Sequence, residues 1–344
     1  MVANAPKSKG SSAQNKPISN NSNNNSSTTT SNLQIHHNKS NHLNQQQQPK
    51  TSQSQWTPLM SACYEGNFES VKYLLDSYSS EEINLGDSNG RSAFYAACCQ
   101  GNVEIVKLMM ENPKVNLNKS SSGHWTPLMI ACANGHFEVV QILVNDKRVD
   151  LNFQDFFGET AFYAACKNEK LEIVKFMANN NEVDINKHNN KGWTPLIFVC
   201  EKGLTDIAQV LLRNKRIDIN FQSRHGETAI HVASYNAKIE IVKLLLMNDN
   251  TALNKTNKFG STPLMIACQI CHLELVERFL ASSCQVNIQA RDIYDRKTAI
   301  DHARVRKHSE ILKLLNAFEE NPDKVRRHLR KKLGLTGLFL FYFI

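Results

Sequence analysis

The chain has 344 residues, 41% of them hydrophobic, and a formal net charge of +8. Its longest apolar run, residues 335–344, is too short to cross a bilayer as a helix. The positive charge lies at the two ends of the chain, with a net charge of +5 in residues 1–55 and +5 in residues 301–344, so residues 56–300 carry a net charge near −2. This distribution does not indicate a central domain that binds nucleic acid through basic residues.

Residues 1–55 form the first segment. They contain eleven Asn, the run Gln45 to Gln48 and five Lys, but no acidic or aromatic residue. A segment of this composition cannot bury enough apolar surface to offset its conformational entropy, so it is predicted to be a disordered tail. It has no apolar stretch of the kind that a secretory signal needs.

A four-residue motif then recurs with a nearly constant period. The copies begin TPLM at 57, SAFY at 92, TPLM at 126, TAFY at 160, TPLI at 194, TAIH at 228, TPLM at 262 and TAID at 298. The steps are 34 to 36 residues, and TPL-type units alternate with TAF-type units. A period of this length predicts a solenoid of eight stacked helical units.

The third unit shows how one copy is expected to fold. Thr126 can cap a helix, Pro127 suits the first helical position, and Gly135 can supply the left-handed stop. A second helix follows with the sequence FEVVQILV, and Asn and Asp residues after it are expected in turns. The unit is therefore predicted to be a pair of helices with a Gly-containing turn before the next unit.

Over residues 56–318 this pattern resembles the ankyrin repeat family, whose units carry the motif T-P-L-H-x-A, two antiparallel helices and a returning loop. The resemblance implies an all-α solenoid with β-turn fingers. It also implies a concave groove that holds protein partners. A tetratricopeptide array has a similar period, but it lacks this motif.

Two departures from the family pattern affect stability. The fourth motif position is usually His, yet only His231 keeps it, so apolar packing is expected to replace the usual hydrogen bond in the other units. The Gly that stops the first helix is replaced in four units by Glu169, Ala237, Cys271 and Lys307. A non-Gly residue in left-handed geometry costs about 1 kcal/mol, so these units should be weaker or turn differently.

The sequence contains no nucleotide, hydrolase or metalloprotease motif, and we expect no catalytic residue, no cofactor, no metal and no small-molecule substrate. Five of the nine cysteines recur at one place in the motif, which indicates packing rather than disulfides or zinc binding. Cys268 and Cys271 form the one CxxC, for which packing is favoured over a redox pair. Reduced thiols fit a cytoplasmic location, or a nuclear one.

Residues 319–334 are predicted to form a basic amphipathic helix. Its apolar residues can cap the last repeat. Its basic face contains Arg326, Arg327, Arg330 and Lys331, and it is either solvated, bound to an anionic partner, a nucleic acid or a membrane surface, or used as a nuclear import signal. The apolar tail 335–344 either docks onto the array or marks a chain cut short.

Two functions fit these features: a monomeric scaffold or adaptor that binds a protein partner, or the regulatory part of a larger enzyme or channel assembly. All three tryptophans, Trp56, Trp125 and Trp193, stand just before a TPL motif. In ankyrin repeats that position faces the groove, which makes them candidate partner-binding residues together with Phe156, Phe157 and Phe259. Alternatively, each Trp covers its own turn.

Overall fold

The computed structural model of the protein describes residues 56–335. The predicted disordered tail and all but the first residue of the predicted apolar tail lie outside the described residues. Within them the secondary structure is helical, as predicted.

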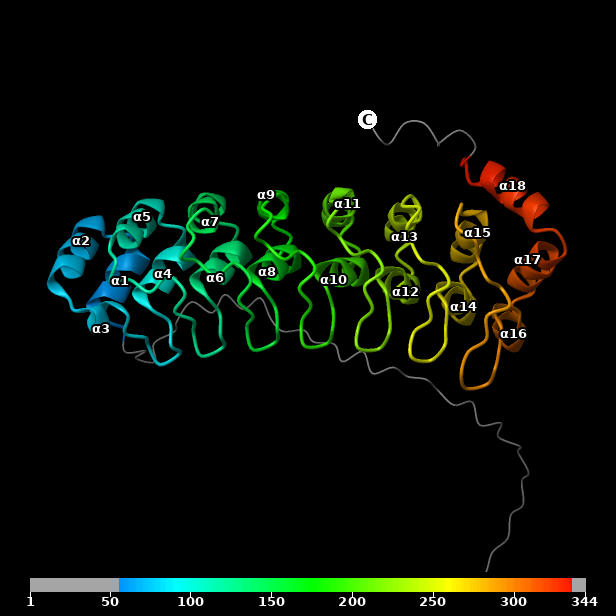
Figure 1. The fold of residues 1–344 in the computed structure, drawn as a ribbon, viewed down its shortest axis with the longest axis horizontal. Helices are drawn as coiled ribbons and strands as arrows, with labels where there is room; N and C mark the ends of the chain where they lie inside the picture. The colour runs from blue at the N-terminus through cyan, green and yellow to red at the C-terminus, as the bar shows by residue number, and fades with distance from the viewer. Residues whose placement is uncertain (1–55, 336–344) are drawn as a thin grey trace, which may run out of the picture. The chain divides into compact units, whose positions relative to one another are not determined.

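The helices form eight successive pairs, drawn as a row in Figure 1. The first helices of the pairs are α1 (Pro58–Glu65), α4 (Ala93–Gln100), α6 (Pro127–Asn134), α8 (Ala161–Lys167), α10 (Pro195–Lys202), α12 (Ala229–Tyr235), α14 (Pro263–Gln269) and α16 (Ala299–Val305). The second helices are α2 (Phe68–Ser77), α5 (Val103–Glu111), α7 (Phe137–Val144), α9 (Leu171–Ala178), α11 (Thr205–Arg213), α13 (Ile239–Leu246), α15 (Leu273–Ala281) and α17 (Ser309–Glu320).

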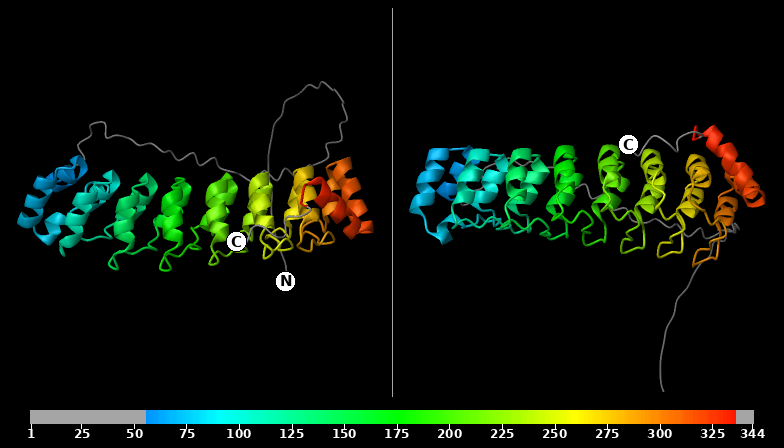
Figure 2. Two further views of the ribbon diagram at one scale, coloured as in Figure 1. Left: turned by 90° about the horizontal axis from the view of Figure 1, so that it is seen from above. Right: turned by 45° about the horizontal axis from the view of Figure 1, so that its top comes forward.

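Each pair packs on its neighbours, first helix on first helix and second on second. Loops between the pairs project from one side of the row, the lower side in Figure 1, and are seen obliquely in the right-hand view of Figure 2. A short helix, α3 (Ser80–Ile83), follows the first pair, and α18 (Pro322–Lys332) follows the last. Because α17 continues to Glu320, it passes the predicted end of the repeats at residue 318.

The first helices begin as the motif predicts. In α6 the Thr126 hydroxyl accepts a hydrogen bond from the Met129 backbone N–H at 3.3 Å, and Pro127 occupies the first turn. The Thr or Ser before each first helix has extended backbone, which lets its side chain cap the free N–H groups. These starts depend on residues three apart, so the sequence alone could locate them.

The first helices stop in one common turn, even where Gly is missing. Gly66, Gly101, Gly135 and Gly203 have φ between 77° and 88°, and Glu169, Ala237, Cys271 and Lys307 have φ between 49° and 60° at the same place in the motif. The four substituted units therefore keep the left-handed turn and accept its strain, rather than turning differently. Packing of the second helix against the first holds each turn in place.

The repeat cysteines are part of the core. The side chains of Cys63, Cys98, Cys132, Cys166 and Cys200 are fully buried. Their small size lets successive first helices approach closely, and the Cys63 thiol lies 3.6 Å from the sulfur of Met109. Burial raises the pKa of Cys63 to about 12 and that of Cys268 to about 12. Thiols with such pKa values are unreactive at neutral pH, which agrees with a packing role.

The fourth motif position keeps more hydrogen bonds than the sequence predicts. His231 makes the expected bond between units, with Nε2 3.1 Å from the Ser261 carbonyl oxygen. However, the Met129 sulfur lies 3.4 Å from the Thr126 N–H, and Asp301 accepts two bonds from Thr298. The expectation of purely apolar replacement was therefore too simple, because a thioether or a carboxylate can also accept from the capping Thr.

An Asn that follows each of the first six second helices links one unit to the next. Asn186 donates from its amide to the Arg216 carbonyl at 2.7 Å and accepts from the Asp218 N–H at 2.9 Å. The same two-way bonding is made by Asn84, Asn118, Asn152, Asn220 and Asn254. These Asn side chains hold neighbouring units together across about 30 residues of chain. The sequence does not reveal this role, because Asn is equally common in local turns.

No helix within residues 56–335 has both the length and the apolar character that a membrane crossing requires.

Candidate protein-binding surface

Seven hairpin loops between the helix pairs, which we call the fingers, form the most regular surface of the array. They comprise residues 87–91, 121–125, 155–159, 189–193, 223–227, 257–261 and 292–297. In the third finger the buried Asp155 carboxylate accepts from the N–H groups of Phe157 at 2.8 Å and Glu159 at 2.7 Å. This side chain closes the loop from inside, while Gly158 makes the turn with φ 77°.

Backbone hydrogen bonds join the tips of successive fingers. The N–H of Asn190 bonds to the carbonyl of Phe157 at 2.8 Å, and that of Lys258 bonds to the carbonyl of His225 at 2.8 Å. Equivalent bonds link the remaining neighbours, from Ser122 to Asn89, Phe156 to Gly123, Arg224 to Lys191 and Ile293 to Phe259. The tips are thus held in a fixed register, so the side chains they carry keep fixed relative positions.

The three tryptophans are half-buried and pack against the core. Trp56 lies edge-on to Tyr64, with ring centroids 4.9 Å apart. The cations of Arg91 and Lys191 lie 5.9 Å from the ring centroids of Trp56 and Trp193. Each indole therefore packs against its own unit and remains partly exposed to solvent.

Trp125 contributes to the next finger. Burial raises the pKa of Asp155, and hydrogen bonds from the backbone of its own finger and from the Trp125 side chain lower that pKa only in part. Trp125 therefore lies next to the buried carboxylate at the base of the third finger.

The predicted phenylalanines differ in exposure. Phe156 and Phe157 are 69% and 62% exposed at the tip of the third finger, where their rings meet edge-to-face at 5.9 Å. Phe259 is half-buried and lies 6.0 Å from the ring of Tyr294 in the last finger. Large apolar side chains that point into solvent at fixed positions are typical of binding surfaces.

Ile293 and Tyr294 were not predicted as candidate residues, although they are 61% and 69% exposed. They lie in the last finger, which is one residue longer than the others. The 36-residue step between the last two motif copies was the signal that could have pointed to this loop.

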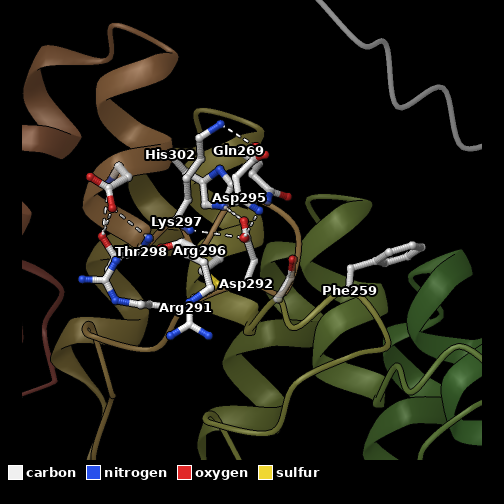
Figure 3. A network of polar contacts seen from close by, with 12 residues as sticks. Phe259, Gln269, Arg291, Asp292, Asp295, Arg296, Lys297, Thr298 and His302 are labelled. Carbon is white, nitrogen blue, oxygen red and sulfur yellow. Dashed lines mark hydrogen bonds and ion pairs between the residues drawn. The ribbon is translucent and has the colours of Figure 1, made fainter.

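A polar network fastens that last finger to the array (Figure 3). The buried Asp292 carboxylate lies 2.9 Å from Nε2 of His302 in α16, and it accepts bonds from the N–H groups of Asp295 and Lys297. The amide nitrogen of Gln269 in α14 lies 3.2 Å from the same imidazole nitrogen. Burial lowers the pKa of His302, and the nearby Asp292 opposes that shift. The network connects a finger to two first helices.

The C-terminal basic helix uses half of its predicted basic face to hold the array. α18 packs across α15 and α17, with Leu329 only 2% exposed. Arg330 donates to the Ala281 carbonyl at 3.0 Å, and the Arg326 guanidinium lies 5.6 Å from the ring centroid of Phe318. By contrast, Arg327 and Lys331 are exposed. These contacts support the capping role.

We expect Leu329→Ala to lower the free energy of unfolding by about 2 kcal/mol, because a buried contact between α18 and the last two repeats is lost. Urea unfolding followed by circular dichroism would measure it. Lys331→Gln is the matched control and should leave stability unchanged. If Leu329→Ala unfolds like the wild type while binding to anionic vesicles is lost, α18 is a recognition helix and not a cap.

Residues 56–335 bring together no group of three or more His, Cys, Asp or Glu side chains that could hold a metal ion.

Comparisons with known proteins agree with this architecture. The family model described as "Ankyrin repeats (3 copies)" matches residues 20–121, 79–155, 108–189, 128–223, 163–255 and 230–327. Among the solved structures that match is the ankyrin repeat domain of Bcl-3, described as a unique member of the IkappaB protein family, with a TM-score of 0.60 and 21% identity over 66% of this chain and 99% of that chain. A search of curated proteins found no match.

Proposed function

This chain belongs to the ankyrin repeat family, and from that premise we propose that it is a non-catalytic scaffold or adaptor that binds a protein partner along its fingers and the adjoining groove. Ankyrin repeats as a class mediate protein–protein interactions. The observation that carries the proposal is the row of tips, which are locked to one another by backbone hydrogen bonds and present exposed aromatic residues such as Phe156 and Phe157.

The composition of this surface supports a protein ligand. Aromatic residues are enriched in the energetically dominant parts of interfaces, and the open faces of Trp56, Trp125 and Trp193 add to those of Phe156, Phe157 and Phe259. The preorganised backbone reduces the entropy lost on binding. We further propose that the protein acts as a monomer in the cytoplasm or nucleus, where its nine free cysteines fit the reducing conditions.

The test is Trp193→Ala, because this Trp lies in the middle of the row and its indole is partly open. We expect the dissociation constant for the partner to rise at least tenfold, which corresponds to about 1.4 kcal/mol of lost binding free energy, with little change in melting temperature. Wild-type protein and the variant would be used side by side for capture from native lysate. The captured protein would then be titrated against both.

Lys72→Gln on the exposed face of α2 is the control for that experiment. A large fall in melting temperature with unchanged affinity would show that Trp193 only stabilises its unit, and the binding surface would have to lie elsewhere on the array.

A further inference from the structure

Four consecutive fingers each present one exposed cation, and we call these residues the cationic tip row. They are Lys191, Arg224, Lys258 and Arg296. Among the described residues none of the four has an ion-pair partner, although Lys191 lies over the ring of Trp193. The backbone bonds between tips hold three of these fingers in register with the next one.

The other charges on the fingers are largely paired. Arg91 in the first finger lies 2.6 Å from Asp87, and the carboxylate of Glu159 in the third finger pairs with Lys167 of α8 at 2.9 Å. In the last finger Lys297 pairs with Asp295 at 2.6 Å, which leaves Arg296 open, as Figure 3 shows beside the Asp292 network. Unpaired positive charge is therefore concentrated on one half of the finger row, within a body whose net charge is near −2.

Apolar side chains flank the cationic tip row at both ends. Phe156 and Phe157 stand on the finger before Lys191. At the other end Phe259 lies beside Lys258, with its ring turned away from the polar network in Figure 3, and Ile293 and Tyr294 lie beside Arg296. A ligand that covers the whole surface must meet apolar residues, then spaced positive charges, then apolar residues again.

The spacing of the fingers sets the spacing of the ligand's charges. Each finger has an outgoing and a returning chain segment, and hydrogen-bonded segments lie about 4.8 Å apart, which gives a finger repeat of about 10 Å. A peptide extended in the polyproline II conformation advances about 3.1 Å per residue with three residues per turn, so every third side chain faces the same side and about three peptide residues pass each finger. Four tips then correspond to about ten residues, with a carboxylate at about every third position.

Charge and spacing together select the occupant. The chain's own N-terminal segment carries +5 and no acidic residue, so it is repelled by the cationic tip row. Duplex DNA carries one negative charge per about 1.7 Å, far denser than one cation per finger, and a site built for it would hold closer-set cations. Widely spaced carboxylates on an extended chain match the row, and apolar residues at both ends match its flanks.

We propose that the cationic tip row binds an extended acidic segment of the partner, about ten residues long, with carboxylates at every third position and apolar residues at its ends. The inference rests on the proposed function, because it specifies which kind of protein segment the fingers recognise. The tips determine the spacing of the acidic residues, and the flanking aromatic residues determine the direction and limits of the segment.

The experiment uses the full chain and three fluorescent probes of equal length, measured by anisotropy at low and high salt. One peptide has Glu at every third position and apolar ends, the second has the same composition with its Glu residues contiguous, and the third is a single-stranded oligonucleotide. We expect the spaced peptide to bind best. We expect Arg224→Glu with Lys258→Glu to weaken that binding at least about tenfold, with a reduced salt dependence.

Lys72→Glu with Lys107→Glu, on the exposed faces of α2 and α5, is the matched control and should change affinity less than about twofold. Thermal melting of both double variants checks that the array stays folded. An equal loss of affinity in the control variant would show that only the net charge of the protein matters. Equal affinity for the two peptides would show that the spacing of the carboxylates does not matter. Either result overturns the inference.

Other occupants give different outcomes. Tighter binding of the oligonucleotide that is lost in Arg224→Glu with Lys258→Glu would mean a nucleic-acid ligand. A wild-type dimer that becomes monomeric in that variant, by sedimentation, would mean that a second copy occupies the row. If the captured partner responds to Trp193→Ala but not to the tip variant, this inference fails and the proposed function stands. If it responds to neither, the proposed function fails as well.

Discussion

Phe162→Ala should destabilise the array by about 3–5 kcal/mol, the largest effect we expect from any single substitution. Phe162 lies in α8 with none of its surface exposed. α8 packs against α6 on one side and α10 on the other, so the lost ring leaves a cavity between units that cannot collapse without shifting both neighbours. The residue is therefore coupled to three repeats at once.

The position of Phe162 also affects how the array unfolds. Units of a solenoid contact only their neighbours, so a weak central interface separates the repeats before it from those after it. We expect the single urea transition of the wild type to become broader or to split in the variant, and circular dichroism and tryptophan fluorescence would follow it.

Phe157→Ala is the matched control, because it removes the same side chain from the same repeat at a position that is 62% exposed. It should change stability by less than about 0.5 kcal/mol. Similar losses in both variants would mean that Phe162 is not part of a tightly packed interface.

The second large effect is a loss of stability in acid that depends on His231. This imidazole is fully buried, and burial lowers its pKa from 6.5 to about 4. Its Nδ1 accepts from the Thr228 N–H at 3.2 Å, so Nε2 carries the proton and donates to the Ser261 carbonyl at 3.1 Å. A second proton would have to break the bond to Thr228 and place a charge in the core.

The sign follows from linkage. The unfolded chain binds a proton near pH 6.5, whereas the folded chain does so only near pH 4, where the pKa of His231 lies. Between these values the unfolded state holds more protons, so stability falls as pH falls through that window. The expected loss from pH 7 to pH 4 is about 3 kcal/mol from this one group.

His231→Met isolates the contribution, because Met129 and Met265 occupy the same motif position and their sulfur atoms lie 3.4 Å from the capping Thr N–H. Free energies of unfolding at pH 7 and pH 4 would be compared for both proteins. The pKa of His302 is also lowered, so this residue likewise reduces the free energy of unfolding as pH falls, and its contribution remains in the variant. An unchanged pH dependence in His231→Met would contradict the prediction.

The eight helix pairs and the places where the helices start could be read from the sequence, because they depend on local chemistry. Thr126 and Pro127 start a helix through contacts within one turn, and Gly135 ends it because only its backbone tolerates φ 88° without strain. The 34-residue period adds the stacking, since each pair needs a neighbour to cover its apolar faces.

The sequence did not determine whether the first helices end in a left-handed turn at Glu169 and Ala237. The tertiary structure determines it. Both residues adopt positive φ, because a different turn would displace the second helix from its neighbours. The bonds of Asn186 to the following repeat were also hidden, since the same residue type serves equally well in a local turn.

The sequence by itself determined the repeats, the family resemblance and the position of the aromatic candidates just before and within the turns. The sequence could not show which charged residues lie together on one surface of the folded array. A body with a net charge near −2 gave no sign of a positive surface, yet folding brings Lys191, Arg224 and Lys258 onto adjacent finger tips although they are 33 and 34 residues apart in the chain. Net charge is a sum over the sequence, whereas a binding surface depends on which charges share one face and which are already paired, and only the tertiary structure decides that.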